Sequence, residues 1–123
     1  MGMKTATKQF GEQVEQLACL WLKKKGLTLI ARNYLCKRGE IDMIMEQDDC
    51  LVFIEVRYRK QVYFGSPAET VTPPKQEKIR LAAEHFLLAH PQHQRKMCRF
   101  DVIAAQPGNS SDKLHFDWIR NAF

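Results

Sequence analysis

Two acidic residues lie in neighbouring segments that have the pattern of β-strands. Asp42 belongs to the segment EIDMIMEQ and Glu55 to the segment CLVFIEVRYR, with Asp48 and Asp49 between the two. A two-residue turn at these aspartates predicts an antiparallel hairpin in which Asp42 lies directly opposite Glu55. Directly opposed residues share one face of a sheet, with Cβ atoms about 4.5–5.5 Å apart.

Two carboxylates at this separation repel each other unless a proton or a cation lies between them. Three apolar residues share the same face of the hairpin and make uncompensated charge there more costly: Ile44, Leu51 and Phe53. A hard divalent cation held by Asp42, Glu55 and water removes the repulsion, and Mg²⁺ or Mn²⁺ suits such oxygen ligands. The hairpin therefore predicts a metal site.

An ordinary charged surface is the alternative interpretation. Asp42 and Glu55 are then solvated, or they pair with one of the arginines Arg38, Arg57 and Arg59. The choice depends on the register of the hairpin, because a slip of one residue places the two acids on opposite faces. The other face is apolar and is predicted to be buried through Ile41, Met43, Met45, Val52, Ile54 and Val56.

The pattern of the rest of the chain predicts the elements that position this hairpin. Apolar residues recur at helical spacing from about residue 8 to 25, and Gly26 ends that pattern as a C-cap. Pro73 and Pro74 open a second helix, with Thr72 as its cap. Strands are predicted over 27–36, 40–47, 50–59 and 97–105, with a loop over 61–72 and a short strand within 113–123.

The order α-β-β-β-α-β predicts a single α/β domain over residues 1–123, with a mixed sheet flanked by helices. Its composition, 45% hydrophobic and 27% charged, is that of a globular protein. The chain shows neither an apolar run of about 20 residues nor a secretory signal, which argues against a membrane protein. Four cysteines without a C-x-x-C pair predict reduced thiols in a cytoplasmic protein, and the net charge of +5 suits a polyanion partner.

Four motifs together resemble the YraN family of small bacterial proteins. They are GEIDMI at 39–44, FIEVR at 53–57, KQ-x-KI at 75–79 and RFDV at 99–102. The resemblance extends from about Gly11 to Asp101 and so covers most of the chain. Because that family is related to archaeal Holliday-junction resolvases and to the PD-(D/E)xK nucleases, the resemblance implies a restriction-endonuclease-like core.

The resemblance also implies roles for individual residues. Asp42 and Glu55 match the two metal-binding acids, Glu15 matches a third acid on the first helix, and Gln76 matches a polar position of the second helix. Arg57 occupies the position of the signature lysine. Arginine keeps the positive charge of lysine, but it does not readily lose a proton to act as a base.

Some of these roles have structural alternatives. Glu15 lies at the edge of the apolar stripe of its helix, where surface glutamates are common, and Glu12 is the second candidate there. In the predicted register Arg57 faces Glu40 and pairs with it across the strands. Asp101 is expected to pair with a nearby arginine, Arg99 or Arg80, and not to act in catalysis.

Basic residues close to these positions predict a rim that contacts phosphates, although each alone is also typical of a solvated surface. The rim consists of Arg59, Lys60, Lys75, Lys78 and Arg80.

Together these features predict an endonuclease that uses Mg²⁺ or Mn²⁺ to cleave DNA, and the resemblance favours branched or structured DNA. One alternative is a nucleic-acid-binding or adaptor module that keeps the fold without turnover. Another is a protein-interaction domain in which the acid pair has no chemical role. The resemblance also allows a homodimer, because resolvases act as dimers on two-fold symmetric junctions.

Overall fold

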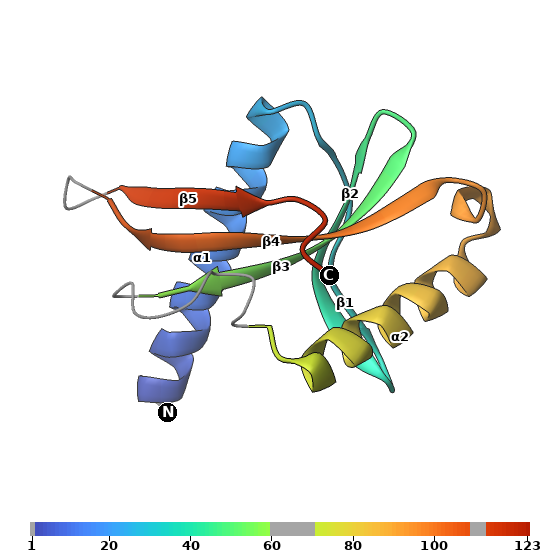
Figure 1. Cartoon of the computed structure of the whole chain (residues 1–123). Coiled ribbons are helices and arrows are strands. Elements are labelled where there is room, and N and C mark those ends of the chain that lie inside the picture. The colour runs from blue at the N-terminus through green and yellow to red at the C-terminus, as the bar shows by residue number, and fades with distance from the viewer. Residues whose placement is uncertain (1, 60–70, 109–112) are drawn as a thin grey trace.

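The computed structural model of the chain describes residues 2–59, 71–108 and 113–123 (Figure 1). Its elements are α1 (Gly2–Lys24), β1 (Thr28–Cys36), β2 (Gly39–Gln47), β3 (Cys50–Tyr58), α2 (Pro73–Ala89), the 3-10 turn η2 (Pro91–His93), β4 (Met97–Pro107) and β5 (Leu114–Ile119). The strands form one sheet in the order β1-β2-β3-β4-β5. β3 and β4 run parallel, and the other neighbours are antiparallel. The predicted mixed α/β architecture is confirmed.

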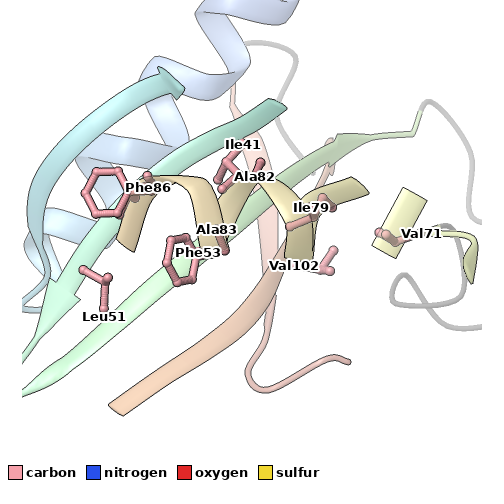
Figure 2. Close-up of a cluster of buried hydrophobic side chains, with 10 residues drawn as sticks. Ile41, Leu51, Phe53, Val71, Ile79, Ala82, Ala83, Phe86 and Val102 are labelled. Atoms are coloured by element: carbon pink, nitrogen blue, oxygen red, sulfur yellow. The ribbon is translucent and has the colours of Figure 1, made fainter. Parts of the chain in front are cut away.

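The two helices cover opposite faces of this sheet (Figure 1). On one face α1 buries Ala18 and Leu22 in a cluster that includes Met45 of β2. On the other face α2 buries Phe86 against Phe53 of β3, with ring centroids 6.2 Å apart (Figure 2). Each helix thus supplies one apolar stripe to one side of the sheet, and the sheet is the middle of three layers.

The ends of the helices agree in part with the predicted boundaries. α1 begins at Gly2, earlier than the predicted residue 8, and Gly26 ends it at a φ of 100° as predicted. Thr72 occupies the N-cap position of α2, but its side chain makes no capping hydrogen bond. Gln76 instead holds the residues before this helix in place, because its Nε2 donates a hydrogen bond to the carbonyl oxygen of Val71 at 2.9 Å.

The predicted register of the β2–β3 hairpin is confirmed between its turn and its centre. Gln47 pairs with Cys50 and Met43 with Ile54, and Asp48 in the turn has a φ of 53°. The pairing ends at Met43 and Ile54, although both strands continue beyond these residues. β2 therefore separates from β3 at Asp42, which comes directly before Met43 in the chain.

This separation changes the face that the beginning of β2 presents. Ile41 belongs to the buried cluster under α2, close to Ala82 in Figure 2, and not to the α1 face with Met43. Ile41 is buried as predicted, but on the other face of the sheet, because the alternation of faces along the strand is interrupted at Asp42. Val56, on the same predicted face, does pack against the α1 cluster.

Three further predictions concern the remainder of the chain. β5 confirms the short strand expected within 113–123. The four cysteines are all free. The predicted loop 61–72 lies outside the described residues, apart from Val71 and Thr72. In the ranges that the structure describes, no helix is long and apolar enough to cross a membrane.

Candidate active site

The site begins at the point where β2 leaves β3. Here Oδ2 of Asp42 accepts a hydrogen bond from the backbone N–H of Val56 at 2.8 Å. This hydrogen bond replaces the backbone pairing of β2 with β3, which ends at Met43 and Ile54. It holds the Asp42 carboxylate beside Glu55, the residue between Ile54 and Val56. The two acids are close neighbours, as the hairpin predicts, although they are not a regular ladder pair.

Glu55 is the most constrained group of the site. Its side chain is 6% exposed, and its Oε2 atom is buried without a hydrogen-bond partner in the described part of the chain. Burial raises the pKa of Glu55 well above its ordinary value, and the hydrogen bond with Asp42 and the charge of that residue add to the rise. A buried carboxyl group of this kind retains a proton or binds a cation, so the residues present fit a metal ion.

Two cations oppose the rise in the pKa of Glu55. Lys75, at the start of α2, places its Nζ 3.7 Å from Oε2 of Glu55, within ion-pair range but too far for a hydrogen bond. Arg57 also lowers this pKa, and its Nε is buried without a partner among the described atoms. Neither cation fully satisfies the carboxyl group. The expected ion pair of Arg57 with Glu40 does not form in the described structure.

Glu15 reaches the same region from α1. Its Oε1 lies 3.8 Å from Nη2 of Arg32 in β1 and is buried without a hydrogen-bond partner in the described ranges. Burial and the charge of Asp42 raise the pKa of Glu15 to about 7, against the opposing charge of Arg32. Glu15 is therefore close enough to Asp42 for the charge of Asp42 to raise its pKa.

The three acids nevertheless do not converge as ligands. Across residues 2–59, 71–108 and 113–123, no group of three or more His, Cys, Asp or Glu side chains is arranged to hold a metal ion. Asp42 and Glu55 form the pair, and Glu15 is turned toward Arg32. Gln76 lies on α2, as predicted, and its Nε2 donates a hydrogen bond to the backbone carbonyl oxygen of Val71. Glu12 is exposed.

The predicted basic rim divides in the structure. Lys75 joins the acid pair, Arg59 lies partly buried at the end of β3, and Lys78 is exposed on α2. Arg80 belongs to another surface, because its Cζ lies 5.7 Å from the ring centroid of Phe100 and 5.4 Å from that of Phe123. Lys60 lies outside the described residues.

Asp101 has the structural role that was predicted for it. It is fully buried, and both of its carboxylate oxygens lie 3.1 Å from Nε of Arg99. It also accepts hydrogen bonds from Nε1 of Trp118 at 2.8 Å and from the backbone N–H of Asn121 at 2.9 Å. These contacts satisfy Asp101 without any role in the acid pair.

Comparison with known proteins identifies a family whose matched region includes the residues of the site. Residues 14–105 match the model of the uncharacterised protein family UPF0102. The chain belongs to this family. The matched UPF0102 region contains Glu15, Asp42, Glu55, Arg57 and Gln76. The resemblance to the YraN family is thereby confirmed, and its relation to resolvases and PD-(D/E)xK nucleases stays a prediction.

Several UPF0102 proteins are similar to this chain over nearly their whole length. The UPF0102 protein of Nitrosococcus oceani is 48% identical over 122 residues, which is 98% of this chain and 97% of that protein. The one from Saccharophagus degradans is 50% identical over 113 residues, covering 92% and 91%. The one from Pseudomonas aeruginosa is 35% identical over 120 residues, covering 98% and 96%.

The sequence did not predict one residue of the site, Arg32. Arg32 lies on β1, opposite Met43, and its guanidinium pairs with Glu15. Its Nε is buried without a partner in the described structure. The pairing of β1 with β2 shifts between Leu29 and Ala31, and no sequence motif marks this irregularity.

Proposed function

We propose that this UPF0102 protein is a metal-dependent endonuclease that hydrolyses DNA phosphodiester bonds at the Asp42–Glu55 pair. The observation that carries the proposal is the buried Oε2 of Glu55, which has no hydrogen-bond partner among the described residues and adjoins a second carboxylate. Two acids in this arrangement favour a cation between them. The motifs shared with the YraN family support a nuclease over other uses of a carboxylate pair, and they favour branched or structured DNA as the substrate.

Each residue of the pair has a defined task in this proposal. Asp42 and Glu55 would hold Mg²⁺ or Mn²⁺, which when bound lowers the pKa of a water ligand and neutralises charge on the phosphate. The Val56 N–H orients the Asp42 carboxylate toward Glu55. Lys75 and Arg57 bring positive charge to the same side of the sheet, where a phosphate would approach.

Glu15 adds a proton-transfer group. With a pKa of about 7, its carboxyl group accepts and releases protons close to neutral pH. A general acid or base works best when its pKa is near the working pH. Arg32 holds this carboxyl group at the edge of the site.

The test is cleavage of labelled duplex, flap and four-way-junction DNA in Mg²⁺ or Mn²⁺. We expect wild-type protein to cut at least one substrate, and Asp42→Ala to reduce the rate by roughly 100-fold or more. The matched control is Asp117→Ala, which removes an exposed acid of β5 and should leave the rate unchanged. Folded wild-type protein that leaves every substrate intact contradicts the proposal.

A second candidate is a nucleic-acid-binding module without turnover. The observation that favours it is Arg57, whose guanidinium does not give up a proton where the related nucleases carry lysine. A binding module retains DNA affinity in a chelator and after Asp42→Ala. DNA is the partner in both proposals, so cleavage and not affinity separates them.

A further inference from the structure

Aromatic rings and positive charges meet on a second surface, where the end of α1 passes behind β5 (Figure 1). Trp21 of α1 lies against Phe116 and Trp118 of β5, with ring centroids 5.4 and 6.2 Å apart. All three rings are partly exposed. We call these rings, together with Lys25 and Arg120, the tryptophan patch.

The cations of the patch lie over its rings. Nζ of Lys25 is 5.0 Å from the centroid of Trp21, and Cζ of Arg120 is 4.0 Å from the centroid of Trp118. Lys23 and Lys24 are also exposed, in the last turn of the same helix. The patch therefore combines a concentrated positive charge with three partly exposed aromatic rings.

The two acids of the described structure that adjoin Trp118 do not cancel this charge. Asp101 accepts the indole hydrogen bond of Trp118, but it is fully buried and already pairs with Arg99. Asp117 precedes Trp118, so strand alternation directs it to the opposite face, where it pairs with His115. The surface remains attractive to an anion.

The position of the patch relates it to the acid pair. Trp118 pairs with Ile103 across β4, Ile103 pairs with Val56 of β3, and the N–H of Val56 binds Asp42. The patch and the acid pair are thus three strand spacings, about 14 Å, apart along the sheet, but on opposite faces, because Ile103 and Val56 pack in the α1 cluster whereas Glu55 faces Lys75 of α2. The bond from Trp118 to buried Asp101 fixes the ring before any ligand binds.

We propose that the tryptophan patch binds a single-stranded segment of nucleic acid. Bases stack on Trp21 and Trp118 or on the guanidinium plane of Arg120, and the lysines contact phosphates. A duplex hides the faces of its bases inside its own stack, so the patch selects unpaired strands. This inference rests on the proposed function and specifies its substrate class: DNA with an unpaired strand that reaches the α1 face of the sheet while the bond to be cut lies at the acid pair.

The experiment uses the fluorescence of the protein itself. The chain contains two tryptophans, Trp21 and Trp118, so their emission reports on the patch alone. Full-length protein is titrated with a labelled oligothymidylate in a chelating buffer, and tryptophan emission and probe anisotropy are followed together. We expect emission to be quenched in step with the rise in anisotropy, and a blunt duplex to bind roughly tenfold more weakly.

Two double variants make the test specific. Lys25→Ala with Arg120→Ala should weaken binding of the oligonucleotide by roughly tenfold or more at low salt. Lys8→Ala with Arg95→Ala removes the same charge from exposed positions elsewhere, and its affinity should stay within about twofold of wild type.

The outcomes separate the patch from the nuclease. Anisotropy that rises while tryptophan emission stays constant, equal affinities of the two double variants, or no binding of the oligonucleotide each overturns the patch. A protein that cuts DNA without such quenching keeps the proposed function and loses this inference. Quenching without cleavage of any substrate keeps the patch and removes the endonuclease.

Discussion

Glu55 and Glu15 resist ionisation because they are buried near another carboxylate. Between the ordinary and the raised pKa of such a group, the folded protein binds more protons than the unfolded chain. The free energy of unfolding therefore falls as the pH rises through that interval. For Glu15 the interval extends from about 4.5 to about 7, and for Glu55 it extends further toward alkaline pH.

The fall in the free energy of unfolding with rising pH predicts the effect of Glu55→Gln. The neutral amide has the size of the carboxylic acid but does not ionise, so the variant should lose much of the decline in stability between pH 5 and pH 8. At pH 8 we expect it to exceed wild type by about 1–2 kcal/mol, which raises Tm by roughly 5 °C. Circular dichroism during heating at both pH values measures this. The exposed Glu84→Gln serves as control, and parallel pH profiles for Glu55→Gln and wild type would contradict the prediction.

Binding of a metal to the same pair has a measurable effect on stability. A cation that binds the folded site and not the unfolded chain stabilises the protein, by about 1.4 kcal/mol at a tenfold excess over its Kd. We expect millimolar Mg²⁺ or Mn²⁺ at pH 8 to raise the Tm of wild type. Asp42→Ala should abolish the shift and Asp117→Ala should preserve it. An equal shift in all three proteins would indicate a nonspecific salt effect.

At the scale of elements, the hairpin shows how far local sequence information extends. The two aspartates of its turn set the register from Gln47 to Met43, because turn length decides which residues face each other. The separation at Asp42 depends on a bond to Val56, fourteen positions along the chain. A pattern of alternating residues does not contain that contact, so the acid pair was predictable and the face of Ile41 was not.

The helices show the same division. The apolar stripe and Gly26 made α1 and its end predictable. The orientation of Glu15 was not, since Arg32 reaches it from another element and across an irregular part of β1. Arg80 was placed near the site by its position on α2, whereas its contacts are with Phe100 and Phe123, at positions that the sequence alone does not bring near α2.

The close approach of α2 to β2 predicts a sensitive position at Gly39. A Cβ atom there would lie 2.5 Å from the backbone carbonyl oxygen of Lys78, which has little freedom to move. Gly39→Ala should therefore destabilise the protein by about 1–3 kcal/mol. Gly11→Ala is the matched control, since its Cβ meets nothing within 4 Å and alanine favours the helix by up to about 1 kcal/mol. Denaturant unfolding of both variants measures the contrast, and equal midpoints would refute it.

At the scale of the whole molecule, Asp101 on β4 is the centre of a hydrogen-bond network that links β2 to β5 and the residues after it. It binds Arg99, which in turn donates to Oε1 of Gln47 on β2 at 2.8 Å, and it accepts from Trp118 and Asn121 near the C-terminus. Asp101→Asn places an amide among donors and leaves Arg99 without its anion. We expect a loss of about 3 kcal/mol or more in urea unfolding, compared with less than about 0.5 for the exposed Asp117→Asn. Similar losses for the two variants would contradict this.

The strand pairings of this sheet differ in the length of chain that each one closes, and the parallel pairing of β3 with β4 closes a long segment. β1, β2 and β3 meet through short turns, whereas pairing Cys50 with Met97 closes all of the intervening chain, including α2. Closing so long a segment costs entropy before its contacts form, so we expect the β1–β3 meander in the folding transition state and β4 with β5 after it. Stopped-flow kinetics would then show Asp101→Asn acting mainly on the unfolding rate. Substitutions in the β2–β3 turn would slow folding instead.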